Sequence, residues 1–214
     1  MERMPYSDLM VAIAPAARTI ETGWRRRLPV LEGKSITLRE LRLSDAVTLF
    51  SMLAAEEVAR FISPPPSTID GFERFIEWTH REREAGNYVC FGIVPRGMDE
   101  AVGIIQIRKT EPGFSTAEWG FALGSPFWGS GSFVEGADLV LDFAFDVIGV
   151  HRLEARAAVR NGRGNGALKK IGALQEGILR RSLLRNGEYH DQVLWAIIDT
   201  DRREARASRG PSVH

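Results

Sequence analysis

Residues 125–145 read SPFWGSGSFVEGADLVLDFAF, and this stretch decides how the rest of the sequence is interpreted. Gly129 and Gly131 stand directly before a long apolar pattern of helical period, which predicts a glycine turn leading into a helix. The first NH groups of a helix lack intrahelical partners, and the helix dipole makes that end positive. A strand, a glycine turn and a helix in this order therefore form a cradle that a phosphate can approach closely.

Three phosphate ligands and one purely structural role compete for the glycine segment. A P-loop requires Lys and then Ser or Thr after the second glycine, and Ser132-Phe133 does not supply them. A dinucleotide fingerprint requires a third glycine where Val134 stands, and it usually opens its sheet. The pyrophosphate of coenzyme A is the third ligand. A tight strand-to-helix turn without any ligand remains the alternative.

The composition is typical of one soluble globular domain. The chain has 214 residues, 44% of them hydrophobic, and its 28 basic residues balance 28 acidic ones. This balance argues against a general nucleic-acid binder, and no apolar run reaches the roughly 18 residues of a membrane span. The N-terminus lacks the pattern of a signal peptide, and the single Cys90 excludes an intrachain disulfide. We expect a cytoplasmic protein with no nucleic-acid or membrane partner, no metal site, and Cys90 as a small buried hydrophobe.

Alternating and helical patterns follow one another in the order β-α-α-β-β-β-α-β-α-β-β. Strands are predicted at 35–41, 87–95, 101–109, 116–123, 151–159, 174–185 and 188–198, and helices at 44–55, 68–85, 132–148 and 163–171. Asn186-Gly187 predicts a hairpin between the last two strands. This order predicts a mixed-sheet α/β (α+β) domain with helices on its faces. Residues 1–30 are expected to be an extension of uncertain structure, 31–199 the domain, and 200–214 a flexible tail.

Further motifs occur in a fixed order on both sides of the glycine segment. They are Leu38-Arg39-Glu40, Asp45, Ala117-Glu118-Trp119-Gly120-Phe121, Trp128-Gly129-Ser130-Gly131, Glu135, Arg152, Asn161 to Gly164, Lys170-Ile171-Gly172, Glu176-Gly177, Leu179-Arg180 and Gly187-Glu188-Tyr189-His190-Asp191. Over residues 33–198 this set resembles the GCN5-related N-acetyltransferase (GNAT) superfamily, and more closely its RimJ/RimL-like branch of ribosomal-protein N-terminal acetyltransferases. The resemblance implies the GNAT fold, a mixed and mostly antiparallel central sheet flanked by helices, with acetyl-CoA as the acetyl donor.

The resemblance also implies which residues bind coenzyme A. The pyrophosphate would lie on the main-chain NH groups of Trp128, Gly129, Ser130, Gly131 and Ser132. Free backbone groups of Phe121, Ala122 and Leu123 would pair with the pantetheine arm, and one NH would polarise the thioester carbonyl. Asn161 would bond the pantetheine, or serve only as a helix cap. Arg163, Lys169 and Lys170 would meet the ribose phosphate, or form a solvated basic face.

The acid and base that the family uses are missing from the expected positions. Many relatives place a Tyr on the helix after Asn161, where this chain has Ala167-Leu168-Lys169. RimL-like members use a Ser and a Glu at the positions of Gly164 and Leu183. Glu118, beside the expected thioester, is the first candidate base, with a salt-bridged sheet carboxylate as its alternative role. His190 is the second, because histidine titrates near neutrality, with a structural hydrogen bond as its alternative.

A site poor in bases favours an acceptor amine of low pKa. An α-amino group has a pKa of about 7.7–8.0, whereas a lysine side chain has one of about 10.4 and is almost entirely protonated at neutral pH. The sequence therefore predicts acetyl transfer to a protein or peptide N-terminus. A small-molecule amine such as an antibiotic or polyamine, a catalytically weak CoA-binding regulatory module, and a nucleotide binder are the alternatives. The acceptor is expected near SPPPS (63–67), 72–75 and 185–190, on a monomer or homodimer.

Overall fold

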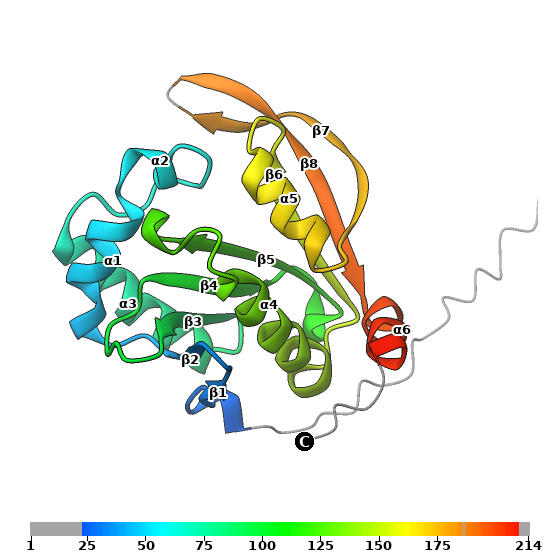
Figure 1. Cartoon of the computed structure of the whole chain (residues 1–214), viewed down its shortest axis with the longest axis horizontal. Helices are drawn as coiled ribbons and strands as arrows, with labels where there is room; N and C mark the ends of the chain where they lie inside the picture. Colours follow the sequence, from blue (N-terminus) through cyan, green and yellow to red (C-terminus); the bar gives the residue numbers. More distant parts are fainter. Residues whose placement is uncertain (1–22, 186, 210–214) are drawn as a thin grey trace, which may run out of the picture.

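A computed structural model of the chain describes residues 23–185 and 187–209, and one sheet of eight strands runs through it (Figure 1). The strand order is β1-β2-β3-β4-β5-β6-β8-β7. The strands are β1 Leu31–Glu32, β2 Ile36–Glu40, β3 Tyr88–Pro95, β4 Gly103–Lys109, β5 Thr116–Leu123, β6 Arg152–Ala158, β7 Leu174–Arg185 and β8 Glu188–Ile198. Among these, β5 and β6 pair in parallel and all other neighbours pair antiparallel. The predicted mixed, mostly antiparallel sheet is confirmed.

Helices cover both faces of this sheet, as the order of elements predicts. They are α1 Ala46–Leu53, α2 Glu56–Ala59, α3 Ile69–Glu84, α4 Ser132–Asp142 with a π-helical continuation Phe143–Ile148, α5 Gly162–Lys170 and α6 Asp199–Arg209. Helices α1 and α3 pack on one face and α4 on the other, and β7–β8 projects beyond the body of the sheet (Figure 1). Helix α2 was not predicted, because four residues are too few to show a helical period.

The central strand β3 shows why the sequence gives two cores. Its residues are buried along nearly the whole strand, so both of its faces must meet other elements. Val89, Phe91 and Ile93 belong to the cluster under α4, where the rings of Phe91 and Phe143 meet edge to face at 5.2 Å. Cys90 belongs to the other cluster, and burial raises the pKa of its thiol, which confirms it as a buried hydrophobe.

The beginning of the described chain belongs to the domain core. Residues 1–22 of the predicted extension lie outside the described residues, but Trp24 and Leu28 are 7% and 3% exposed. The indole of Trp24 packs edge to face on Phe114 at 5.9 Å. The sequence left the structure of this extension uncertain, and from Gly23 onward the chain packs onto the domain core. A single aromatic residue followed by three arginines carries no period, although its burial contributes about 2 kcal/mol or more.

The predicted flexible tail at 200–214 is wrong for residues up to Arg209, because α6 is a helix packed against α4. Arg202 is 6% exposed, and its guanidinium bonds Asp138 at 2.8 Å and Asp142 at 2.5 Å. Arg206 adds an ion pair with Asp146 at 2.8 Å. The sequence analysis sought an apolar stripe in this segment. The helix is instead attached by arginine side chains, whose long stems pack while their charges pair.

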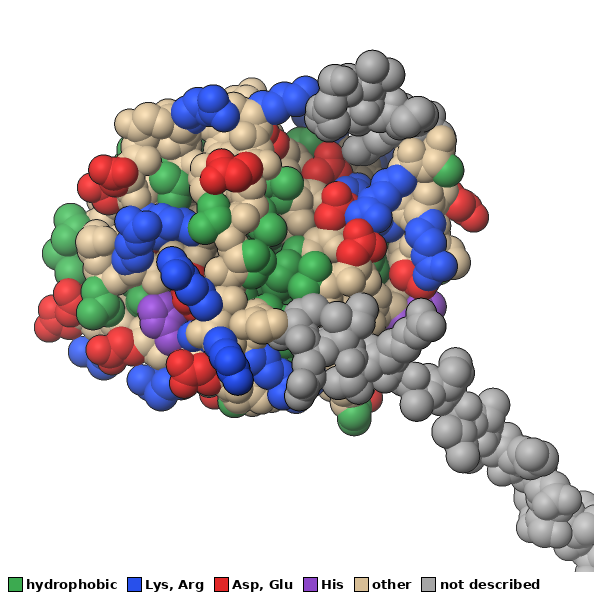
Figure 2. Space-filling model, turned by 90° about the horizontal axis from the view of Figure 1, so that it is seen from below, with side chains coloured by type: hydrophobic (Ala, Val, Ile, Leu, Met, Phe, Trp, Pro, Cys, Tyr) green, Lys and Arg blue, Asp and Glu red, His purple; other side chains and the backbone are tan. Residues whose placement is uncertain are grey.

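Acidic and basic side chains are intermixed on the surface, and they also pair inside the protein. On the face that Figure 2 shows, Lys and Arg side chains lie among Asp and Glu side chains. Inside the protein, Arg39 and the fully buried Asp45 form a pair with two hydrogen bonds of 2.8 Å. Burial raises the pKa of Asp45, but the hydrogen bonds from Arg39, Arg42 and Ala101 outweigh it and lower the pKa. Arg39 and Asp45, which belong to the motifs that carry the family resemblance, thus have a structural role.

Candidate active site

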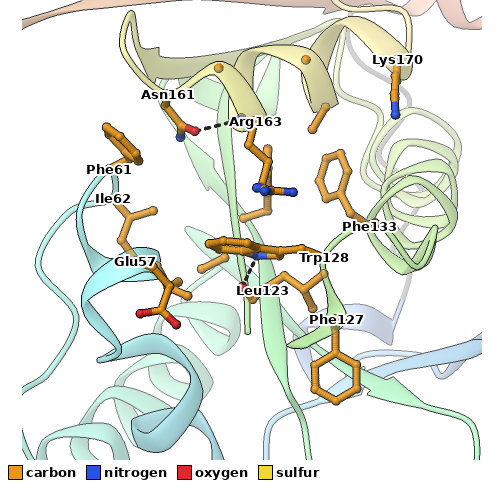
Figure 3. A pocket seen from close by; sticks show the side chains of 18 of the residues that line it. Glu57, Phe61, Ile62, Leu123, Phe127, Trp128, Phe133, Asn161, Arg163 and Lys170 are labelled. Atoms are coloured by element: carbon orange, nitrogen blue, oxygen red, sulfur yellow. Dashed lines mark hydrogen bonds between the residues drawn. The ribbon is translucent and has the colours of Figure 1, made fainter. Parts of the chain in front are cut away.

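The site begins where two parallel strands separate. Thr116 to Glu118 of β5 pair with Arg152 to Glu154 of β6, and beyond these residues β6 pairs with β8 alone. The edge of β5 from Trp119 to Leu123 is consequently left without a strand partner. A cavity of about 770 Å³ opens there, between β5, the glycine segment, α2 and the start of α5 (Figure 3).

The register of the sheet decides which backbone groups of β5 face this cavity. The NH of Lys109 donates to Asn87, so odd-numbered residues of β4 bond to β3 and even-numbered ones bond to β5. Ile104 is opposite Ala122, and Ala122 therefore directs its NH and C=O toward β4. The alternate residues Phe121 and Leu123 turn theirs to the open side. Of the three predicted pantetheine partners, Ala122 has no free backbone group, although it lines the cavity.

The glycine segment has the geometry of an anion cradle. Gly129 and Gly131 have φ of +78° and +89°, and a Cβ added to either would meet nothing within 4 Å. Glycine is needed for the left-handed backbone and not for space. Among the hydrogen bonds of the described residues, none uses the NH of Gly129, Ser130 or Gly131. These donors stand at the positive end of α4, so they fit a diphosphate.

Two members of the predicted cradle are engaged elsewhere. The NH of Trp128 donates to the carbonyl of Ser125 at 3.1 Å, and the NH of Ser132 donates to the Ser130 hydroxyl at 3.3 Å. That hydroxyl also donates to the Phe127 carbonyl at 2.7 Å. The side chains of Ser130 and Ser132 thus brace the loop, and neither residue lines the cavity.

Trp128 and Arg163 meet across the cavity, one from the glycine segment and the other from α5 (Figure 3). The Arg163 guanidinium carbon lies 4.3 Å from the centre of the indole ring, in cation–π contact. The indole NH donates to the carbonyl of Leu123 at 2.8 Å. One backbone acceptor on the open edge of β5 is therefore occupied by the protein itself.

Asn161 has the cap geometry that was its alternative role. Its Oδ1 accepts the NH of Gly164 at 2.9 Å, at the start of α5, and the side chain also lines the cavity (Figure 3). A Cβ at Gly164 would lie 2.5 Å from Asn161 Nδ2. The serine that relatives place there would thus displace the amide in this chain.

The two predicted bases lie away from the glycine cavity. Glu118 Oε2 is 2.6 Å from Arg108 Nη2 on the neighbouring strand, and Glu118 does not line the cavity. This is the salt-bridged sheet carboxylate named as its alternative. His190 lines a second cavity of about 650 Å³, which shares Arg60 and Phe61 with the first. Its Nε2 is 4.0 Å from Glu188 Oε2.

Sequence reasoning missed several residues that line the first cavity. They include Glu57, Phe61 and Phe133, whereas Lys170, which also lines the cavity, was among the expected ribose-phosphate contacts (Figure 3). Glu57 comes from α2, and its Oε1 accepts the hydroxyl proton of Ser125 at 2.7 Å. This hydrogen bond lowers the pKa of the Glu57 carboxyl, so it is ionised at neutral pH. A helix of four residues shows no period in the sequence, and Glu57 was therefore not among the predicted site residues.

Glu135 has a structural role in the first turn of α4. Its carboxylate accepts the NH of Ser35 at 3.1 Å, together with the NH of Lys34 and the Ser35 hydroxyl. Burial raises the pKa of Glu135, but these hydrogen bonds outweigh it and lower the pKa. Within residues 23–185 and 187–209, no cluster of His, Cys, Asp and Glu could hold a metal ion, and no helix is long and apolar enough to cross a membrane.

Comparisons with known proteins agree with this geometry. Residues 35–174 match the acetyltransferase (GNAT) domain family. The "Probable N-acetyltransferase YjcK" of Bacillus subtilis (strain 168) is 28% identical, and the alignment covers 80% of this chain and 98% of that one. The "[Ribosomal protein uS5]-alanine N-acetyltransferase" of Escherichia coli (strain K12) is 23% identical over 61% of this chain and 68% of its own. The structure of Mycobacterium smegmatis RimJ in complex with CoA-disulfide superposes with a TM-score of 0.73 at 22% identity, covering 85% and 93%. The chain therefore belongs to the acetyltransferase (GNAT) domain family and is an N-acetyltransferase that uses acetyl-CoA.

Proposed function

We propose that this acetyltransferase acts on the α-amino group of a protein or peptide N-terminus. The observation that carries the proposal is the scarcity of proton acceptors around the cavity. Among the described residues that line it, Glu57 is the one carboxylate, and none is a histidine. An amine that must lose its proton without a protein base is better matched to an α-amino group than to a lysine.

Glu57 suits binding of the amine better than removal of its proton. Its lowered pKa keeps the carboxylate charged but makes it a weak base, because basicity falls with pKa. A carboxylate on the cavity wall attracts a protonated amine from solution. Solvent then accepts the ammonium proton, and at pH 7 this deprotonation costs an α-amine only about 1 kcal/mol.

Main-chain NH groups would hold acetyl-CoA, the acetyl donor. Acetyl-CoA, when bound, supplies an activated acetyl group as a thioester. The free NH groups of Gly129, Ser130 and Gly131 would hold the diphosphate, and Phe121 and Leu123 offer NH groups toward the pantetheine side. An NH from this edge that reaches the thioester carbonyl would stabilise negative charge on its oxygen. Arg163 and Lys170 add positive charge on the α5 side of the cavity.

A pair of matched peptides tests the proposal. One peptide has a free N-terminus and no lysine, and the other has a blocked N-terminus and one lysine at the same distance from the same flanking residues. CoA release and mass spectrometry should show transfer to the first peptide, with kcat/KM rising with pH toward the amine pKa of about 8. Preference for the lysine peptide, or for a polyamine or aminoglycoside included in the panel, would contradict the proposal.

A further inference from the structure

The second cavity continues the site on the acceptor side. It lies between the β7–β8 hairpin, the end of β6 and the segment after α2, and it shares Arg60 and Phe61 with the cofactor cavity. Its walls are formed by Arg60, Phe61, Ala158, Val159, Arg160, Leu183, Arg185, Glu188, Tyr189, His190 and Asp191. A peptide whose amine enters the first cavity would extend its following residues into this one.

Three arginines on these walls have no carboxylate partner among the described residues. Arg60 contacts the ring of Phe61, with its guanidinium carbon 5.6 Å from the ring centre. Arg160 makes no side-chain hydrogen bond or ion pair within the described chain. Arg185 donates from Nη2 to the Ala59 carbonyl at 3.0 Å, while its Nε is buried without an acceptor. A partly buried guanidinium with one neutral partner leaves its charge uncompensated.

The two acids of the cavity do not neutralise these arginines. Asp191 Oδ1 accepts the backbone NH of Arg181 at 2.8 Å. Glu188 is 79% exposed at its side chain and lies 4.0 Å from His190. Neither carboxylate forms an ion pair with Arg60, Arg160 or Arg185 in the described structure. The cavity therefore offers an anion several guanidinium donors, whose planar fork fits a carboxylate.

We propose that this cavity selects acceptors with a glutamate or aspartate side chain close behind the reactive amine. The proposal rests on the proposed function, and it names the class of peptide that the site prefers. The amine would lie near Glu57 in the first cavity, and the acidic side chain among Arg60, Arg160 and Arg185 in the second. Opposite charges at the two ends would fix the direction of the peptide across the site.

Calorimetry on the full-length protein saturated with CoA tests the proposal without requiring turnover. The probes are free N-terminal peptides that carry Glu, or Gln in its place, at the second, third or fourth position. We expect the best Glu peptide to bind about tenfold more tightly than its Gln counterpart, as one charge-assisted hydrogen bond provides. Arg160→Gln and Arg60→Gln should each reduce this difference. Arg156→Gln, which changes an exposed arginine of β6 outside the cavity, should leave it unchanged.

The possible results separate the two proposals. Equal affinity for every Glu and Gln pair, or a difference that survives both cavity variants, would overturn the acidic preference. If Glu and Gln peptides are acetylated at the N-terminus at equal rates, the proposed function holds and the acidic preference fails. If the Glu peptides bind more tightly but no peptide is acetylated, the acidic preference holds and the proposed function fails.

Discussion

The cofactor half and the acceptor half proposed for this site are built from different parts of the chain. The proposed cofactor half consists of backbone NH groups on β5, on the glycine segment and at the start of α4. The acceptor half consists of side chains from α2, the end of β6 and the β7–β8 hairpin, which are far apart in sequence. Main-chain NH donors are directed by the backbone conformation alone, which glycines permit. Side-chain groups can instead be changed by single substitutions. We infer that the cofactor is set by local backbone geometry, and the acceptor by residues that only the fold brings together.

Gly131→Val should give the largest effect, because it strains the backbone of the cofactor half. A β-branched residue at φ +89° strains the turn, and relaxing that strain would rotate the free NH groups out of the cradle. We expect CoA affinity to fall about 100-fold in calorimetry. The control is Gly97→Val, at φ +86° in the β3–β4 turn, which should cost similar stability but leave CoA affinity within about threefold. Equal CoA affinity in the two variants would refute the main-chain cradle.

Arg202→Met tests whether α6 belongs to the folded domain. The substitution leaves Asp138 and Asp142 without their buried guanidinium, and should lower the free energy of unfolding by about 2 kcal/mol. For a chain of this size the midpoint of thermal unfolding should fall by roughly 4–8 °C. Arg203→Met, on the exposed side of the same helix, should change stability by less than about 0.5 kcal/mol. An unchanged melting temperature for Arg202→Met would restore the flexible tail that the sequence predicted.

Glu57→Gln tests the acceptor half by removing one charge at nearly constant shape. We expect the KM for a peptide amine to rise about tenfold, since one charge-assisted contact is lost, with CoA affinity unchanged. Glu56→Gln, the exposed neighbour that does not line the cavity, provides the matched control. A parallel loss of CoA affinity would show that the two halves of the site are not separable. An unchanged KM would remove Glu57 from the proposal.

Glu135→Gln should give the smallest effect, because it loosens only the attachment of α4 to the β1–β2 turn. The native pKa of Glu135 is lowered, so its contribution to stability is present above the usual value of about 4.5 and is lost as the pH falls further. At pH 7 the variant should be about 1 kcal/mol less stable in urea unfolding, and near pH 3 the difference should shrink. A difference that grows on acidification would contradict this sign.

Much of the fold and of the cofactor half followed from local patterns. The glycine pair, the alternation of the strands and the order of elements predicted the sheet and the helix after the cradle, and the family resemblance implied free backbone groups on β5. Local pattern failed where an element had no period, as in α2, or no apolar stripe, as in α6. It also failed for single residues, because the side chain of Glu118 pairs with its cross-strand neighbour Arg108 and the backbone of Ala122 faces β4. A shift of one residue in the register would reverse both assignments.

The sequence by itself determined the conformation of the segment around Gly129 and Gly131, because chain sterics act between adjacent residues and need no distant partner. It likewise predicted the acetyl donor, through the family resemblance of short motifs that occur in a fixed order over residues 33–198. Only the tertiary structure decided that Glu57 faces the cofactor cavity, that Glu118 is paired with Arg108, and that three arginines without carboxylate partners surround the acceptor cavity. These relations join residues separated by long stretches of chain, and their distances are set by sheet register and helix packing.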